Sequence, residues 1–354
     1  MARSAAIMQT KVGSMSIHEI AKRAGVSIAT VSYALNNKKK VSEEKRELIL
    51  KIAEEMNYVP NSLAKGLLAK RTNIIGLIVP DLSVPYTLAI IRHLEYYARK
   101  NDLYLLLGHT DGHMSTLRSI VDNFINKNVD GLILATGLGL NEEDHLHKVI
   151  ARIQKFKVPL VVMSPINALS SHRTNYVIPD LEDGAYQATR FLVDHGARRM
   201  LYVGGYASDF LTDIRHQGFE RAMQEANLPV EPATYRNCGY TFDDGYRAIR
   251  QVLQEGLPLP EAIVTINDSV ALGIFKGLKE QGIRVPEDVS LVGYDDIELP
   301  TLDFVPLTTV RIPVDDMSKL CIEGLIKYRE GNNLTFQYML KPQLIVRESV
   351  KVRG

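Results

Sequence analysis

The chain has 354 residues, of which 45% are hydrophobic and 23% charged, and this length suits two or three domains. The composition excludes a chain that is disordered throughout, and the longest apolar runs, such as IIGLIV at 74–79, are far too short to span a membrane. Cys238 and Cys321 lie far apart and outside any CxxC pattern. They favour a reducing compartment over a disulfide framework or a zinc site.

Charge is distributed unevenly along the chain. Residues 1–71 hold 13 Lys and Arg against 6 Asp and Glu, a net charge of +7, whereas the remainder holds 29 against 35, a net charge of −6. A basic head on an acidic body is typical of a protein that binds a polyanion such as nucleic acid. Residues 1–14 lack the apolar core of a signal peptide. We expect a disordered leader there, or translation that begins at Met15.

Three short helices are predicted between residues 16 and 58. The stretch SIHE at 16–19 has the spacing of a capping box, Gly25 supplies a tight turn, and Ser27 and Ser42 can cap the second and third helices. Helix, glycine turn and helix make a helix-turn-helix arrangement. The outer face of the second helix could then enter a major groove with Ile28, Ala29, Thr30, Ser32, Tyr33 and Asn36. The alternative is a plain three-helix bundle.

The next segment, PNSLAKGLLAKRT at 60–72, predicts a short helix with Asn61 as its cap. Gly66 weakens it by about 1 kcal/mol relative to Ala, so it is marginal by itself and could become ordered only with a partner. An ordinary interdomain linker is the alternative.

From residue 74 onward strand-like runs alternate with amphipathic helical segments. The predicted strands are 74–79, 103–108, 131–136, 159–164, 200–205, 262–267 and 289–294, and the predicted helices are 86–99, 115–127, 183–195, 214–226, 242–255 and 268–281. Such alternation predicts parallel sheets covered by helices on both faces. About 280 residues suit two lobes, whose strand ends would face a ligand-binding cleft.

Polar residues follow several of these strands. Asn267 and Asp268 start the segment NDSVALG, Asp295 and Asp296 end VGYDD, and Arg215 opens a helical stretch. Such side chains at strand ends suit a hydroxyl-rich ligand, although helix capping and a salt bridge are the structural alternatives. No dinucleotide loop, Walker lysine or GxSxG pattern is present. His145 and His147 stand two apart in a polar stretch, which favours a pair of surface side chains over a metal site. We therefore predict no catalytic residue, cofactor or metal.

The chain resembles the lac and gal repressor family of bacterial transcription regulators from about Ile17 to Ser349. The motifs that carry the resemblance are, in order, IHEIAKRAGVSIATVSYALNN, VSEEKRELILKIAEEMNYVPNSLAKGL, NIIGLIVPDLSVPY, VDGLIL, NDSVALG, VPEDVSLVGYDDIELP and PLTTVRIP. The ordered series is far more specific than any single motif.

The resemblance implies a small all-α DNA-binding head at 15–59, a hinge helix at 60–71 and a two-lobed α/β body like the periplasmic sugar-binding proteins at 72–354. The first lobe would comprise about 72–164 and 302–331, and the second about 174–295 and 335–350. The chain would then cross between the lobes near 164–174, 295–304 and 331–337.

The resemblance also implies the residues of two sites. Those that contact DNA would be Ser16, Ser27, Ile28, Ala29, Thr30, Ser32, Tyr33, Asn36, Asn61, Ala64, Lys65 and Leu67, with Leu67 opening a central base step from the minor groove. Those that contact the effector would be Tyr86, Arg215, Tyr240, Asn267 and Asp295. Arg215 and Asp295 would hydrogen-bond ligand hydroxyls, and the two tyrosines would cover an apolar face.

The implied function is that of a cytoplasmic, nucleoid-associated repressor. Its affinity for a near-palindromic operator would be controlled by a small molecule, which we expect to be a sugar, through closure of the cleft. The sequence stops after RESVKVRG without a heptad tail, so we expect a homodimer with no membrane attachment.

Some positions depart from the family pattern. Tyr33 stands where an arginine is frequent in the DNA-contacting helix, VPYT at 84–87 replaces Asn-Pro-Phe-Phe, and Ser164 stands where an aspartate is frequent. These departures allow a different operator and a smaller or less hydroxylated ligand. Three alternatives remain: a transport-type binding protein, an enzyme acting on a sugar or nucleoside, and a regulator whose effector is a phosphorylated carrier protein.

Overall fold

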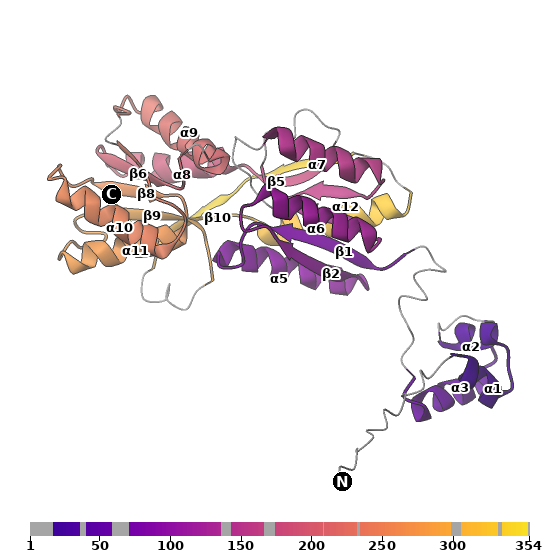
Figure 1. Ribbon diagram of the computed structural model, residues 1–354. Helices are drawn as coiled ribbons and strands as arrows, with labels where there is room; N and C mark the ends of the chain where they lie inside the picture. Colours follow the sequence, from indigo (N-terminus) through magenta and orange to yellow (C-terminus); the bar gives the residue numbers. More distant parts are fainter. Residues whose placement is uncertain are drawn as a thin grey trace, which may run out of the picture. The chain divides into compact units, whose positions relative to one another are not determined.

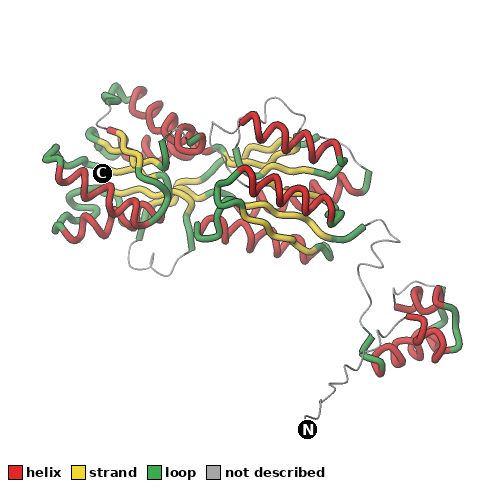
Figure 2. The backbone as a smooth tube through the Cα atoms, viewed as in Figure 1, coloured by secondary structure: helices red, strands yellow, loops and turns green. Residues whose placement is uncertain are grey.

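The structure is a computed structural model that describes residues 17–35, 40–58, 71–135, 143–165, 174–207, 209–231, 234–298, 306–331 and 335–352 (Figures 1 and 2). Its contacts divide the chain into two compact units, Met1–Thr72 and Asn73–Gly354. The expected leader at 1–14 lies outside the described residues. So do residues 59–70, which contain almost all of the expected hinge helix.

The head consists of α1 (Ile17–Ala24), α2 (Ile28–Leu35) and α3 (Glu43–Glu55). Gly25 joins α1 to α2 with a φ of +63°, a left-handed conformation that glycine adopts without strain. Ile20, Val31 and Ile49, one from each helix, have no exposed surface and form the centre of a small separate core. The predicted helix-turn-helix is confirmed.

The first lobe of the body contains a parallel sheet whose described strands follow the order β11-β5-β4-β3-β1-β2. Its strands are β1 (Ile74–Val79), β2 (Tyr104–His109), β3 (Gly131–Leu134), β4 (Leu160–Val162), β5 (Asn175–Pro179) and β11 (Gln337–Leu340). Its helices are α5 (Pro85–Lys100), α6 (Met114–Asn126), α7 (Glu143–Lys155) and α12 (Val314–Arg329).

The second lobe repeats this plan with the strand order β12-β10-β9-β8-β6-β7, in which only β12 runs antiparallel to its neighbour among the described pairs. Its strands are β6 (Met200–Gly204), β7 (Tyr235–Asn237), β8 (Ala262–Thr265), β9 (Ser290–Asp295), β10 (Thr308–Arg311) and β12 (Gln343–Ile345). Its helices are α8 (Leu181–Asp194), α9 (Phe210–Glu225), α10 (Phe242–Gln254) and α11 (Asp268–Glu280).

Each sheet is covered on both faces, which explains why its central strands are almost continuously apolar. One apolar cluster lies under α6 and α7 in the first lobe, and another lies under α10 and α11 in the second. A third cluster includes buried residues of α5 and α12 together with residues of α8 and α9. The two lobes therefore share part of their core, and the predicted two-lobed parallel α/β fold is confirmed.

The crossings between the lobes were predicted at the wrong positions. The chain leaves the first sheet between β5 and α8 at 179–181, returns between β10 and α12 at 311–314, and crosses again between β11 and β12 at 340–343. Hence β5 and β11 belong to the first lobe and β10 to the second, contrary to the expected lobe boundaries. These strands are short, and the buried threonines of β10 hide its apolar pattern.

Candidate functional site

The head presents one face of α2 to solvent. Val31 and Ala34 are buried, whereas Ile28 is 41% exposed and Ser27 and Ala29 are exposed beside it. The Ser27 hydroxyl accepts a hydrogen bond from the backbone N–H of Thr30 at 3.1 Å, so Ser27 caps α2 as predicted. The exposed face begins at the helix N-terminus, the part that enters a major groove in helix-turn-helix proteins.

The predicted DNA-contacting residues of this face carry hydroxyl and apolar groups without formal charge. Thr30, Ser32 and Tyr33 are half-buried, and the Lys40 Nζ atom lies 5.6 Å from the centre of the Tyr33 ring. The remaining predicted DNA contacts, Ser16, Asn36, Asn61, Ala64, Lys65 and Leu67, lie outside the described residues. The structure therefore places only the α2 part of the predicted interface.

A buried ion pair lies at the carboxyl end of the second sheet. Arg215, on the second turn of α9, approaches Asp295 at the end of β9 with Nη2 3.4 Å from Oδ1, and both side chains are at most 7% exposed. Arg215 Nη1 donates to the Ile266 carbonyl, and its guanidinium group lies 4.1 Å from the centre of the Tyr294 ring. Burial raises the pKa of Asp295 to about 7, although Arg215 opposes this shift.

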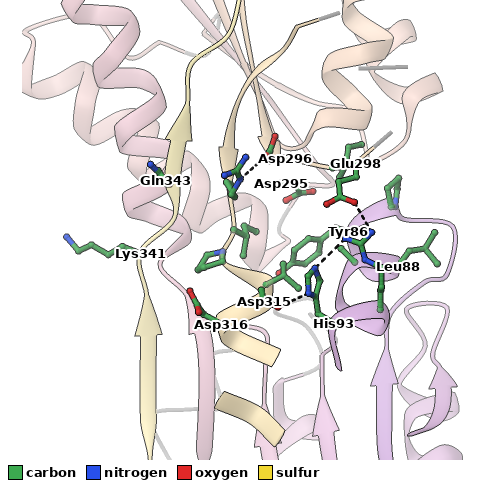
Figure 3. Close-up of a pocket in the computed structure, with 18 of the residues that line it drawn as sticks. Tyr86, Leu88, His93, Asp295, Asp296, Glu298, Asp315, Asp316, Lys341 and Gln343 are labelled. Carbon is green, nitrogen blue, oxygen red and sulfur yellow. Dashed lines mark hydrogen bonds and ion pairs between the residues drawn. The ribbon is translucent and has the colours of Figure 1, made fainter. Parts of the chain in front are cut away.

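Tyr86 brings the first lobe to this pair. It lies in the first turn of α5 and reaches toward Asp295 (Figure 3). Burial raises the pKa of Tyr86 above its ordinary value, with Asp295 adding to the shift and Arg215 opposing it. The three predicted effector residues Tyr86, Arg215 and Asp295 therefore form one group that includes side chains of both lobes.

Tyr240 and Asn267 form a second group at the same edge of the sheet. The Asn267 Nδ2 atom donates to the Tyr240 carbonyl at 3.0 Å, while Oδ1 accepts from the Val270 N–H at 2.8 Å and caps α11. The Tyr240 hydroxyl bonds to the Asp209 carboxylate and lies 3.2 Å from the Thr212 hydroxyl. Asn267 thus has the capping role that the sequence offered as an alternative to ligand contact.

A cavity of about 1050 Å³ lies beside the crossing segments (Figure 3). Tyr86 and Asp295 line it, together with the start of α5 and residues 295–298 and 311–316, whereas Arg215, Tyr240 and Asn267 do not. The Arg92–Glu298 ion pair, 2.7 Å long, joins α5 to the segment after β9 in this wall. The volume is that of a small-molecule site, and the wall combines apolar side chains with many polar and charged ones.

Sequence reasoning missed several polar residues that the fold brings to these sites. Asp209 bonds to Tyr240, and His93 of α5 lies 3.0 Å from Asp315 at the start of α12. An aspartate directly before a helical pattern could have indicated Asp209. His93 and Asp315 carry no such signal, because their proximity results from packing between helices far apart in sequence.

Within the described part of the chain, no group of three or more His, Cys, Asp or Glu residues has the arrangement of a metal site. None of the described helices is both long and apolar enough to cross a membrane.

A helix-turn-helix head joined to a two-sheet body with a polar cavity at the strand ends defines the class of ligand-responsive DNA-binding regulators. Residues 16–61 match the family model of bacterial regulatory proteins, lacI family, and residues 189–350 match the model of the periplasmic binding protein-like domain. The chain belongs to the lacI family of bacterial transcription regulators.

Individual relatives resemble the chain along almost its whole length. The ribose operon repressor of Haemophilus influenzae is 31% identical over 337 residues, which cover 94% of this chain and 97% of the relative. The crystal structure of the lac repressor dimer bound to operator and the anti-inducer ONPF is 25% identical, with a TM-score of 0.85 over 95% of this chain and 98% of that one. The complex of the transcriptional regulator CelR with cellobiose is also 25% identical, with a TM-score of 0.69 over 94% and 99%. These relatives are transcription regulators.

Proposed function

We propose that this protein is a transcriptional repressor whose affinity for operator DNA is controlled by a small carbohydrate bound between the two lobes. The observation that carries the proposal is the combination, in one chain, of an exposed α2 face on a basic head and, in the body, the buried Arg215–Asp295 pair with the half-buried Tyr86 beside it. The first feature suits DNA and the second suits a hydroxylated ligand.

On the DNA side, α2 would lie in the major groove of a near-palindromic operator. Ser27, Thr30 and Ser32 would bond to phosphates or base edges, Ile28 and Ala29 would contact thymine methyl groups, and Tyr33 would replace a frequent arginine. The flanking contacts of Ser16 and Asn36 and the minor-groove contacts of Asn61, Ala64, Lys65 and Leu67 complete the predicted interface.

On the effector side, Arg215 and Asp295 would bond ligand hydroxyls from the second lobe. Tyr86 would cover the ligand from the first lobe, Tyr240 would contact its apolar face, and the remaining N–H of the Asn267 amide would complete the site. The ribose operon repressor and the cellobiose complex of CelR support a sugar as the ligand class. No catalytic role or cofactor is proposed.

The operator-bound form would be a homodimer, as the lac repressor structure is. Exposed apolar residues on neighbouring elements of the first lobe offer a surface for the second copy, namely Tyr104 and Leu107 on β2 and Leu88 and Tyr96 on α5. Two-fold symmetry would match the symmetry of the operator. A regulator of this kind works in the cytoplasm, on the nucleoid.

A binding selection tests the proposal. The full chain would be mixed with sheared genomic DNA, and the retained fragments tested by mobility shift against a panel that includes D-ribose and cellobiose. We expect a discrete retained fragment whose complex responds to one sugar, by release or by tightening. Retention of all fragments alike would contradict sequence-specific binding, and chemical conversion of the bound sugar would indicate an enzyme instead.

A further inference from the structure

The turn that follows β9 has an unusual backbone. Asp295 and Asp296 are consecutive and both have positive φ, +105° and +52°. Residues with a Cβ atom seldom adopt this region, and two in succession remain there only when surrounding contacts hold them. The turn therefore needs specific partners, and it carries the Asp295 carboxylate of the proposed effector site.

Asp268 supplies one of these partners from below the turn. Its side chain has no exposed surface. Oδ2 accepts a hydrogen bond from the backbone N–H of Ile297 at 2.9 Å, and Oδ1 accepts from the Thr309 hydroxyl of β10 at 2.6 Å. The Thr309 hydroxyl oxygen in turn accepts a hydrogen bond of 3.4 Å from the backbone N–H of Asp296. One carboxyl group thus connects α11, β10 and the end of the turn.

These bonds are not those of an ordinary helix cap. Asn267 is the residue that caps α11, through Val270, and Asp268 is the first residue of the helix itself. The Asp268 side chain instead faces β9, where a Cβ atom at Gly293 would come within 2.1 Å of Oδ1. Glycine at 293 is therefore required to admit the carboxyl group beneath the strand.

The turn has consequences in both lobes. At its first residue, Asp295 meets Arg215 in the second lobe. Just beyond Ile297, Glu298 meets Arg92 on α5 of the first lobe at 2.7 Å. Asp296 is held between Arg311 and Arg347, each 2.6 Å away. A change in the backbone at 295–297 would therefore move both the ligand-binding carboxylate and a contact between the lobes.

We propose that Asp268 is a positioning residue, which holds the turn Asp295–Ile297 in the conformation that presents Asp295 to the effector and Glu298 to α5. This inference rests on the proposed effector site, because Asp295 is part of it. Asp268 itself reaches neither the ligand nor the DNA. Burial raises the pKa of Asp268 to about 8, with Asp295 and Asp296 adding to the shift, so its neutral form is favoured. Asparagine is also neutral and has the same shape; its carbonyl can accept from the Ile297 N–H, and its amide can donate to the Thr309 hydroxyl.

The test compares Asp268→Asn and Asp268→Ala with the wild-type chain by hydrogen–deuterium exchange of the peptide at 290–298. Alanine leaves the Ile297 N–H and the Thr309 hydroxyl without a partner in a buried place, whereas asparagine can accept from the first and donate to the second. We expect at least tenfold faster exchange at 295–298 in Asp268→Ala and exchange within twofold of wild type in Asp268→Asn.

Asp288→Ala is the control, because Asp288 holds Arg284 in an exposed loop of the same lobe. Its exchange at 295–298 should match that of the wild type. If Asp268→Ala does not fold, Thr309→Val removes the hydroxyl that donates to Asp268 and accepts from the Asp296 N–H, and it should accelerate exchange of the same segment severalfold. Unchanged exchange at 295–298, or equal acceleration along the whole body, would overturn the positioning role.

A second readout uses the sugar identified by the binding selection. Asp268→Ala should need at least tenfold more of it to change operator affinity, with operator affinity in its absence within threefold of wild type, and Asp268→Asn should restore the response. If no sugar acts on the wild-type chain, the proposed function fails while the exchange result still decides the role of Asp268. A normal sugar response in Asp268→Ala would overturn the inference.

Discussion

Arg215 uses only part of its hydrogen-bonding capacity within the described residues. Nη1 and Nη2 have the partners Ile266 and Asp295, but Nε is buried without one. A guanidinium group that is buried, paired and still holds a free donor suits a site completed by a ligand oxygen. The same features make Arg215 expensive to remove, because Asp295 then remains buried without its cation.

Arg215→Ala should lower the free energy of unfolding by about 3 kcal/mol, as expected for a broken buried ion pair. It should also abolish the operator response to sugar while operator binding itself persists. Urea unfolding and mobility shifts measure the two effects. Arg221→Ala is the matched control on the same helix, because Arg221 forms a largely exposed pair with Glu182. A full sugar response in Arg215→Ala would show that the cleft is assigned wrongly.

The raised pKa of Asp268 predicts how stability depends on pH. Its ordinary pKa is 3.8 and burial raises it to about 8, so between these values the folded chain keeps a proton that the unfolded chain has released. This group therefore makes the free energy of unfolding decrease as pH rises from about 4 to 8. Urea midpoints across this range should decline less in Asp268→Asn than in wild type. Identical slopes in both chains would contradict the raised pKa.

At this scale the sequence could indicate Arg215, Asp295 and Asn267 because each stands at a strand end or in the first turns of a helix that follows one. It could not indicate that the Asn267 side-chain oxygen caps α11, or that Asp268 lies under β9 and bonds to Thr309. Those contacts depend on the approach of α11, β9 and β10, which no local pattern determines.

At the scale of elements, α10 and α11 cross closely because glycines lie between them. A Cβ atom at Gly245 would come within 2.2 Å of the Val270 carbonyl oxygen, and one at Gly273 within 2.0 Å of the Phe242 carbonyl oxygen. Both neighbours are backbone atoms, which cannot rotate away. This crossing positions the N-terminus of α11, and with it Asn267 and Asp268.

Gly245→Ala should therefore lower the free energy of unfolding by about 2–3 kcal/mol, since overpacking forces the two helices apart. Gly277→Ala provides the comparison, because the one close contact of its Cβ, at 2.4 Å, would be with the Cγ2 atom of the Ile249 side chain, which can shift, while the Tyr246 backbone oxygen stays 3.7 Å away. Thermal or urea unfolding of both variants measures the difference. Equal destabilisation would indicate that backbone contact is not the deciding factor.

A prediction at this scale concerns residues 60–71, which we propose as a hinge helix. Leu67→Ala should weaken specific operator binding by at least tenfold, because it removes the side chain expected to unstack a base step, while salt-sensitive binding to random DNA changes little. Titrations of operator and random duplexes at two salt concentrations separate specific binding from salt-sensitive, non-specific binding. A parallel loss on both duplexes would count against a hinge helix.

Long, uniformly apolar strands were predicted correctly. The runs that became β1, β3, β4, β6, β8 and β9 stand out because both faces of each of these strands are covered. The run that became β2 is equally apolar, although β2 is an edge strand with exposed side chains. The strands β5, β7, β10, β11 and β12 were missed, along with α7 and α12. β11 and β12 are short edge strands with much exposed surface, and β10 buries threonines, so their patterns resemble loops. The misplaced crossings follow directly from these omissions.

At the scale of the whole molecule, the head and the body each have a hydrophobic core of their own. The fragment 73–354 should therefore fold and bind the sugar with an affinity within threefold of the full chain, yet show no binding to operator. Calorimetric titration and mobility shift measure these properties. If the fragment loses sugar binding although it is folded, the effector site would need more than the body.

The three crossings at 179–181, 311–314 and 340–343 have a mechanical consequence. A single tether would let one lobe swivel in every direction, and two would still permit rotation about the line that joins them. Three separate tethers suppress twisting and sliding, so bending remains the soft mode. A molecule that binds between the lobes would therefore change mainly the angle between them. Two symmetry-related copies can convert this change of angle into a change in the spacing of the two DNA-binding heads.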